Sequence, residues 1–197
     1  MKVRLGIIGK SFAGKETVYK IIKKLAKSHG LKTSIHHFSD PLNEILDILH
    51  LPKAGPEGRP NQQKLSTILR QGFSENVLGD VIMARAQADI ADIVCLDGVR
   101  RPQDVMKLHG LSNFHLIFVD TPLEKRFEFG QKRTDRPVQT WEEFIAGQKA
   151  EAESKIDEIV IQADIRLDNS GSKEHLKKHV ETKIMPLILA KSPVFLK

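Results

Sequence analysis

Short apolar runs alternate with helical patterns along the chain. Apolar residues, many of them β-branched, form five runs of strand length, at residues 3–8, 33–38, 93–96, 114–119 and 165–167. After the first run, apolar residues recur with the i, i+3, i+4, i+7 spacing of an amphipathic helix, at Val18, Ile21, Ile22 and Leu25. This alternation predicts an α/β protein with a parallel sheet and helices on both of its faces.

Three helices are expected between the second and third strands, with their apolar positions within residues 42–49, 65–69 and 77–82. The stretch at residues 51–60 contains three prolines and two glycines, so we expect a mobile loop there. A second irregular stretch is expected at 130–139. One helix at 141–156 and a closing helix at 173–184 complete the expected elements.

The sequence GKSFAGKET at residues 9–17 directly follows the first predicted strand. Its G-x-x-x-x-G-K spacing is that of a phosphate-binding loop, in which two glycines let backbone N–H groups turn toward a polyphosphate. A lysine in this place reaches the terminal phosphates, and the positive end of the following helix faces the same anion. The alternative is a glycine turn that only joins strand to helix, but spacing and context favour a nucleoside triphosphate site. The loop residues expected to contact ATP are Gly9, Ser11, Phe12, Ala13, Gly14, Lys15, Glu16 and Thr17.

Position 16 narrows this interpretation. In most such loops the residue after the lysine is Ser or Thr, whose hydroxyl binds Mg²⁺ directly, but here it is Glu16, with Thr17 one place later. This departure argues against a GTPase or a motor ATPase. The loop resembles that of the nucleoside monophosphate kinases, of which adenylate kinase is the best known. The resemblance implies that the Mg²⁺ is held mainly through water, by Thr17 and a distant Asp.

The third predicted strand ends in the sequence LDGVRR, which begins at residue 96. An acid at the carboxyl end of a buried strand lies beside the phosphate loop in a parallel sheet, so Asp97 is the candidate for the Mg²⁺ water shell. The alternative is that Asp97 caps a turn with Gly98. Nucleoside monophosphate kinases carry a similar Asp-Gly-…-Arg, although their Phe-Pro before the arginine is absent here. The resemblance implies that Arg100, or less favourably Arg101, binds the acceptor phosphate.

The second predicted strand ends in FSDPL at residues 38–42, which resembles a stretch of deoxynucleoside monophosphate kinases and phosphomevalonate kinases. Ser39 and Asp40 would then border the acceptor pocket, although Asp40 could equally cap the next helix. Arg59 and Arg70 are further candidates, since a guanidinium donates two parallel hydrogen bonds to a phosphate. The alternative for both arginines is a solvated surface charge.

Basic residues gather after the fourth predicted strand, and nucleotide kinases close a lid over the donor phosphates at this point of the chain. The resemblance implies that Arg126, Arg133 and Arg136 contact ATP there, where arginines neutralise charge on the moving phosphoryl group. A charged surface helix and loop is the alternative. The last turn, DNSGS at residues 168–172, would wrap the adenine through Asn169 and Gly171, although helix capping by Ser172 explains it equally well.

Composition adds few constraints. The 197 residues suit one compact domain, with 40% hydrophobic and 28% charged residues, as in ordinary globular proteins. The single cysteine, Cys95, lies in an apolar run and is expected to be buried packing in a reducing cytoplasm.

No apolar run is long enough to cross a bilayer, and the first strand leaves no room for a signal peptide. The net charge of +6 is dispersed, so small phosphorylated ligands explain it better than nucleic acid. His36 and His37 alternate across a strand and cannot face one metal ion.

Taken together, these parts resemble a P-loop nucleotide kinase of the deoxynucleoside monophosphate kinase or adenylate-kinase-like family. The resemblance implies a five-stranded parallel sheet of order 2-3-1-4-5 in one domain, 1–197, with an acceptor-binding helical region at 39–90 and a short lid at 121–156. It also implies transfer of the ATP γ-phosphoryl group to a monophosphate, with Mg²⁺ present. The residues expected to carry catalysis electrostatically are Lys15, Asp97, Arg100, Arg126 and Arg133.

Two other functions remain open at this point. One is a kinase of dephospho-coenzyme A or of a phosphorylated metabolite with a hydroxyl acceptor, for which Asp40 would be the general base. The other is a non-kinase P-loop ATPase or switch. The identity of the acceptor, the choice between ATP and GTP and the oligomeric state leave no signal in the sequence.

Overall fold

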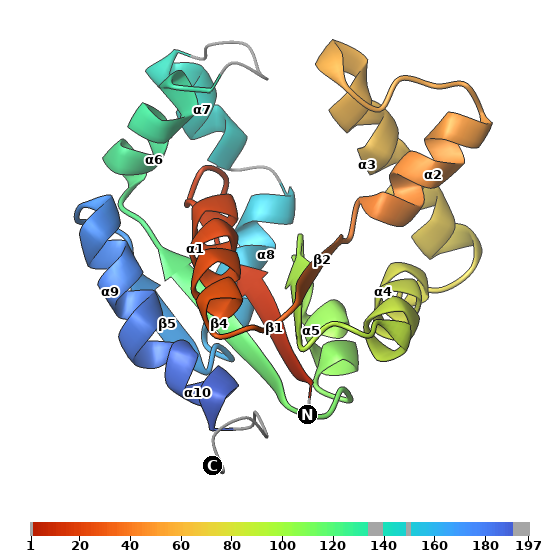
Figure 1. The fold of residues 1–197 in the computed structure, drawn as a ribbon. Coiled ribbons are helices and arrows are strands. Elements are labelled where there is room, and N and C mark those ends of the chain that lie inside the picture. Colours follow the sequence, from red (N-terminus) through yellow and green to blue (C-terminus); the bar gives the residue numbers. More distant parts are fainter. Residues whose placement is uncertain (1, 134–139, 149–150, 191–197) are drawn as a thin grey trace.

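The computed structural model describes residues 2–133, 140–148 and 151–190, with only the backbone at 151–154. At its centre lies a parallel sheet of five strands in the order β2-β3-β1-β4-β5 (Figure 1), which confirms the predicted fold class and strand order. The strands are β1 (Val3–Ile8), β2 (Thr33–His37), β3 (Ile93–Asp97), β4 (Phe114–Asp120) and β5 (Ile165–Asp168). Because all run in the same direction, their carboxyl ends meet at one edge of the sheet.

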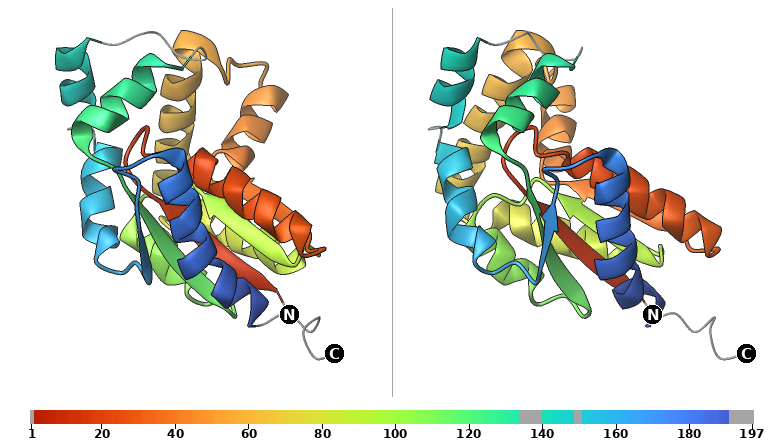
Figure 2. Two further views of the ribbon diagram at one scale, coloured as in Figure 1. Left: turned by 60° about the vertical axis from the view of Figure 1, so that its left-hand side comes forward. Right: turned by 90° about the vertical axis from the view of Figure 1, so that its left-hand side faces the viewer.

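One face of the sheet is covered by α1 (Lys15–Ser28), α9 (Lys173–Lys183) and α10 (Met185–Leu189), as the two views of Figure 2 show. The residues of β1 alternate between the faces, and Leu5 and Ile7 both pack in this layer. The stripe predicted after the first strand buries Val18, Ile21 and Ile22 against it.

The opposite face is covered by α4 (Val77–Ala88), α5 (Pro102–Leu108) and α8 (Glu151–Val160). Ile8 packs in this second layer, where buried residues of all three helices meet the sheet. Each central strand is therefore apolar on both sides, which explains why its sequence reads as a continuous apolar run. Cys95 is fully buried, and burial raises the pKa of its thiol to about 12, so the predicted packing role is confirmed.

Four helices rise beyond the carboxyl edge of the sheet in two groups (Figure 1). One group is α2 (Asp40–Ile48) and α3 (Gly55–Gly72), and the other is α6 (Leu123–Gln131) and α7 (Trp141–Gln148). The loop before α1 lies between the two groups in Figures 1 and 2. No helix in the described part of the chain is both long and apolar enough to cross a membrane.

Some predicted elements were wrong. The loop expected at 51–60 ends early, because α3 begins at Gly55 and Pro56 lies in its first turn. The first four N–H groups of a helix have no intrahelical partner, so a proline costs nothing there. The described residues on both sides of 149–150 are helical, as α7 and α8, so the helix expected at 141–156 is present there and α8 continues to Val160; residues 149–150 lie outside the described residues. Neither α5 nor α10 was predicted. Helices α5 and α10 are only 7 and 5 residues long, which is too short for a helical spacing of apolar residues to be recognised in the sequence.

Candidate functional site

The loop between β1 and α1 has a backbone that two glycines make possible. Gly14 has a φ of +87°, and a Cβ at this position would lie 2.7 Å from Asn169 Nδ2. A Cβ at Gly9 would lie 2.9 Å from the backbone oxygen of Val119. Both glycines therefore permit close approaches that a side chain would block, and the loop keeps the cradle shape that a polyphosphate requires.

The ends of β4 and β5 brace this loop from behind. The carbonyl oxygen of Ala13 accepts hydrogen bonds from Thr121 Oγ1 at 2.8 Å and from Asn169 Nδ2 at 3.0 Å. Asn169 is only 5% exposed, so its side chain lies against the back of the loop. Sequence reasoning placed Asn169 in the adenine-binding turn and did not find Thr121. The sequence offers no signal for Thr121, since its partner lies 108 residues away.

Lys15 lies across the same loop. Its Nζ donates to the carbonyl oxygen of Gly9 at 2.8 Å and contacts that of Lys10 at 3.3 Å. Glu16 is exposed at the first turn of α1 and forms an ion pair with Lys20 at 2.6 Å. The guanidinium of Arg133 lies 3.9 Å from the same carboxylate, so one of the arginines predicted to contact ATP lies near the first turn of α1. Arg136 lies outside the described residues.

Asp97 and His37 form a pair at the ends of β3 and β2. Asp97 Oδ2 lies 3.2 Å from His37 Nδ1, and Asp97 Oδ1 is buried without a hydrogen-bond partner in the described part of the chain. Asp97 is in register with Ile7 of β1, two residues before Gly9, so the pair lies beside the phosphate loop. A buried carboxylate oxygen with no protein partner, next to a phosphate cradle, fits the water shell of a Mg²⁺ ion.

Asp97 and His37 each stabilise the charged form of the other. Burial by itself would raise the pKa of Asp97, but the hydrogen bond with His37 and the positive charge of Lys15 bring that pKa below its usual value. The hydrogen bond with Asp97 raises the pKa of His37, although its burial acts in the opposite direction. Asp97 is therefore ionised at neutral pH, as a metal-binding carboxylate must be.

Arg126 is buried between the loop before α1 and helix α7. It is 5% exposed, its Nε donates to the backbone oxygen of Thr121 at 3.3 Å, and its Nη1 lies 3.4 Å from that of Ser11. The same nitrogen donates to Gln148 Oε1 on α7, and the guanidinium lies 5.7 Å from the ring centre of Phe144. Arg126 thus joins the phosphate loop to α7.

An aromatic cluster also joins the phosphate loop to α6 and α7, and it was not predicted from the sequence. Phe12, which has a φ of +63°, lies 6.2 Å from Phe144, and Phe127 lies 5.1 Å from Trp141 and 5.4 Å from Phe144 between ring centres. Aromatic pairs at such distances attract through burial and through their quadrupoles. The spacing of Trp141 and Phe144 by one helical turn was the available signal.

The turn at residues 169–171 is held from α6. Lys125 Nζ donates to the carbonyl oxygen of Ser170 at 2.7 Å and also to that of Gly171. Ser172 accepts a hydrogen bond from the backbone N–H of His175, so the capping alternative for this turn is present in the structure. A nucleotide contact through Gly171 stays a prediction.

The predicted acceptor residues occupy different places. Ser39 directly precedes α2, and Asp40 Oδ2 accepts the backbone N–H of His37 at 2.7 Å, so this carboxylate closes the turn after β2. Arg59 is exposed on α3, away from the residues that line the pocket described next. Arg100 lies half-buried in the loop after β3. Arg70 and Arg101 of this predicted set line the same cavity.

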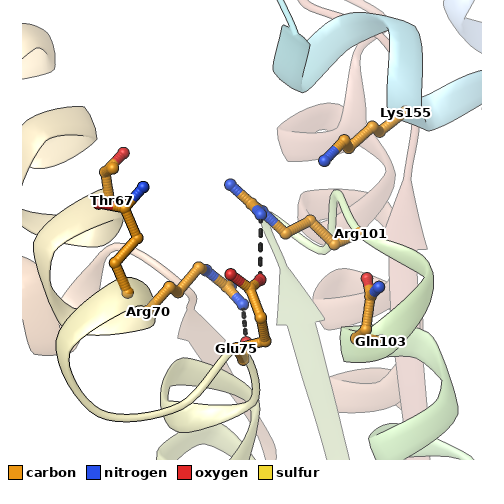
Figure 3. Close-up of a pocket in the computed structure, with 7 residues that line it drawn as sticks. Thr67, Arg70, Glu75, Arg101, Gln103 and Lys155 are labelled. Atoms are coloured by element: carbon orange, nitrogen blue, oxygen red, sulfur yellow. Dashed lines mark hydrogen bonds and ion pairs between the residues drawn. The ribbon is translucent and has the colours of Figure 1, made fainter.

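That cavity, of about 420 Å³, lies between α3, α5 and α8 (Figure 3). In Figure 3, Arg101 and Lys155 extend into the same space from one side, Thr67 and Arg70 lie on the other, and dashed lines join Glu75 to both Arg70 and Arg101. We refer to it below as the basic pocket, and its lining residues are Thr67, Arg70, Gln71, Glu75, Arg101, Gln103 and Lys155.

Arg70 is held inside the wall of the basic pocket by a buried ion pair. Its Nη2 lies 3.1 and 3.2 Å from the two carboxylate oxygens of Asp104, and the two side chains are 4% and 2% exposed. Its Nη1 donates to the backbone oxygen of Glu75. Burial raises the pKa of Asp104, and the charge of Arg70 opposes that rise. Sequence reasoning did not find Asp104, which no motif marks.

Comparison with solved structures places the fold among kinases. A shikimate kinase from Acinetobacter baumannii, in complex with shikimate, matches with a TM-score of 0.57 and 16% identity, covering 100% of this chain and 97% of that one. The protein TT1252 from Thermus thermophilus gives a TM-score of 0.56 at 20% identity, covering 92% and 95% of the two chains. A sugar kinase from Janibacter gives 0.53 at 18% identity, covering 95% and 98%.

Sequence comparison gives a family. No protein-family model matches the chain. A UPF0200 protein of Pyrococcus abyssi is 26% identical over 189 residues, which cover 92% of this chain and 95% of that protein. A UPF0200 protein of Thermococcus kodakarensis is 31% identical over 140 residues, which cover 68% of this chain and 75% of that protein. The chain belongs to the UPF0200 family.

Proposed function

We propose that this protein is an ATP-dependent phosphotransferase that moves the γ-phosphoryl group to the phosphate of a nucleoside or deoxynucleoside monophosphate. One observation carries the proposal. A glycine-built loop follows the carboxyl end of β1, and Arg101, which lines the basic pocket with Arg70 and Lys155, follows the carboxyl end of β3. The fold that the chain shares with shikimate and sugar kinases supports the reaction class.

The donor would bind at the loop before α1. Backbone N–H groups between Gly9 and Thr17 would face its phosphates, and Lys15 would move from the loop carbonyls to the terminal phosphates. We assign residues 121–156 to the lid over this site, with Arg133 and Arg136 approaching the phosphates. Arg126, whose guanidinium joins the loop to α7, would hold that lid in a fixed position relative to the donor.

The residues beside the loop fit a hydrated Mg²⁺ ion. Asp97 offers a buried carboxylate oxygen, and Thr17 lies one turn into α1. When bound, the ion neutralises charge on the phosphates of the donor and holds them in one geometry. His37 keeps Asp97 oriented and ionised through the hydrogen bond between them.

The acceptor would bind in the basic pocket, which the helical region 39–90 forms together with Arg101, Gln103 of α5 and Lys155 of α8. Arg100 and Arg101 follow Asp97 by three and four residues, so they reach from the metal side of the cleft to the acceptor side. An acceptor phosphate oxygen would form the new bond to the γ-phosphorus while the bond to the bridging oxygen of the leaving ADP breaks. The acceptor phosphate is already ionised at neutral pH, so no general base is needed.

A hydroxyl acceptor is the second candidate, and it needs a base. The sequence offers Asp40 for this role, but Asp40 Oδ2 accepts the backbone N–H of His37 and closes a turn. The basic pocket suits a phosphorylated ligand of either kind, so the two candidates are separated by the missing base and not by the charge of the pocket. A P-loop ATPase without an acceptor would leave the basic pocket without a role.

Product formation tests the proposal directly. The wild type is incubated with Mg²⁺, ATP or GTP, and separate panels of nucleoside monophosphates, deoxynucleoside monophosphates and hydroxyl acceptors that include shikimate and dephospho-coenzyme A. We expect a diphosphate product from at least one monophosphate, and a fall of about a hundredfold or more in Lys15→Ala, since Lys15 neutralises transition-state charge. Turnover only with hydroxyl acceptors, or only ATP hydrolysis, would reject the proposal.

A further inference from the structure

Two side chains from outside the phosphate loop hold one of its carbonyl oxygens, that of Ala13. Thr121, directly after β4, donates to it from Oγ1 at 2.8 Å, and Asn169, directly after β5, donates from Nδ2 at 3.0 Å. Asn169 Nδ2 also lies 3.4 Å from Thr121 Oγ1. These atoms form a closed triangle, in which the threonine hydroxyl gives its one proton to the carbonyl and accepts from the amide.

The triangle is shielded from water and carries no charge. Thr121 and Asn169 are only 7% and 5% exposed. An incoming polyphosphate attracts a cation such as Lys15, but it exerts no comparable pull on a neutral hydroxyl or amide. Opening the triangle would leave buried polar groups without partners, which costs more than one hydrogen bond contributes. We therefore expect the Ala13 carbonyl to keep one direction with and without a ligand.

The direction of this carbonyl sets the direction of the next N–H group. The peptide bond between Ala13 and Gly14 is trans, and in a planar trans peptide the C=O and N–H bonds point opposite ways. Because the Ala13 oxygen points at Thr121 and Asn169, the Gly14 N–H points away from them. Gly14 is the N-cap of α1, and the first N–H groups of a helix, which lack intrahelical partners, are suited to donate to an anion.

We propose that Thr121 and Asn169 are positioning residues for the donor, which fix the Ala13 carbonyl and so aim the Gly14 N–H at a phosphate of the nucleoside triphosphate. This inference rests on the donor site of the proposed function. A hydrogen-bond donor that is oriented before the ligand arrives loses no freedom on binding, so it contributes more to affinity than a mobile one. In this role Asn169 acts on the phosphates through the loop, and not on the adenine, for which the sequence made it a candidate.

The test measures equilibrium binding of ADP and of inorganic tripolyphosphate, each with Mg²⁺, by titration calorimetry. Tripolyphosphate has no base or sugar, so it reports on the phosphate loop alone. Thr121→Val keeps the shape of the side chain and removes its hydroxyl, whereas Thr121→Ser keeps the hydroxyl. The matched control is Thr182→Val, because the Thr182 hydroxyl also donates to a backbone oxygen, that of Lys178 at 2.9 Å, but at an exposed position of α9.

We expect Thr121→Val to bind both probes about three to ten times more weakly than the wild type, which corresponds to the loss of one hydrogen bond. Thr121→Ser and Thr182→Val should each stay within about a factor of two of the wild type, since the first keeps the donor and the second leaves the loop untouched. Asn169→Leu, which is similar in size but cannot donate, should also weaken both probes. The double variant of Thr121→Val and Asn169→Leu should bind more weakly than either single variant.

Three results would overturn the inference. The first is an unchanged affinity in Thr121→Val, even where urea unfolding shows that this variant has lost stability, because the hydrogen bond would then be merely structural. The second is an equal loss of affinity in Thr182→Val. The third is a loss for ADP without a loss for tripolyphosphate, which would place the effect at the nucleoside.

Failure of this inference is distinguishable from failure of the proposed function. A wild type that binds neither probe rejects the donor site and both proposals with it. A wild type that binds both probes but phosphorylates no monophosphate rejects the proposed function alone, and the effect of Thr121→Val is still measured. In an active protein, Thr121→Val should raise the KM for ATP and leave the KM for the acceptor unchanged.

Discussion

Replacement of Asp104 by asparagine tests the energetics of the wall of the basic pocket. The substitution keeps the size of the side chain but leaves the guanidinium of Arg70 buried without a counter-charge, with both partners at most 4% exposed. Arg70 Nε already has no partner in the described residues, so Asp104 supplies the main compensation for its burial.

The expected loss is large. Removal of one partner from a buried ion pair costs about 3–5 kcal/mol, against a total stability of about 5–15 kcal/mol for an ordinary domain. Arg70 keeps its charge at every accessible pH, but the wild type contains Asp104, whose pKa is raised by burial and whose linked stability is lost as the pH rises. The loss in Asp104→Asn should therefore be no larger at pH 8 than at pH 5.

Arg70→Met should behave differently. Here the remaining group is Asp104, whose pKa is already raised by burial, and it becomes neutral by binding a proton. A folded-state pKa above the unfolded value means that protonation favours the folded protein. The loss of stability in Arg70→Met should therefore be smaller at pH 5 than at pH 8.

Urea unfolding followed by circular dichroism at pH 5 and pH 8 measures both effects. The control is Asp80→Asn, since Asp80 pairs with Lys107 at 2.8 Å but both side chains are well exposed, and its loss should stay below about 1 kcal/mol. If Asp104→Asn loses no more than this control, the ion pair is not isolated from water and the reasoning is refuted.

Three further results are expected. Gly14→Ala should abolish the calorimetric heat of ATP binding, because Gly14 has a φ of +87° and the new Cβ would lie 2.7 Å from Asn169 Nδ2. Near-normal ATP affinity in this variant would show that the loop tolerates a side chain. Cys95 should react with a thiol reagent only as fast as the protein unfolds, since its burial raises the thiol pKa to about 12, and rapid labelling of the native protein would contradict its burial. The hydrogen bond with Asp97 raises the pKa of His37, so the stability that this pair adds is fully present below pH 6.5 and is lost as the pH rises through the folded-state pKa. The difference in unfolding free energy between wild type and His37→Asn should therefore shrink above pH 6.5, and a constant difference from pH 5 to 9 would exclude this linkage.

The sheet could be predicted because its signals are local. The central strands β1, β3 and β4 are mostly buried on both faces, so they appear as apolar runs, and the helix after β1 shows its stripe at Val18, Ile21 and Ile22. The phosphate loop could be predicted for the same reason, since its shape depends on two glycines and a lysine within seven residues. The position of Asp97 beside the phosphate loop could be predicted because Asp97 ends a buried strand, and ligands bind at the carboxyl ends of parallel strands.

The partners of the polar side chains depended on the tertiary structure alone. Arg70 and Asp104 are 34 residues apart, and Arg101 and Glu75 are 26 apart, so no periodicity connects them. The sequence shows which arginines are present, but helix packing decided that Arg70 is held in a buried pair and that Arg101 contacts the exposed carboxylate of Glu75. Burial sets the strength of each contact, and burial results from the path of the whole chain.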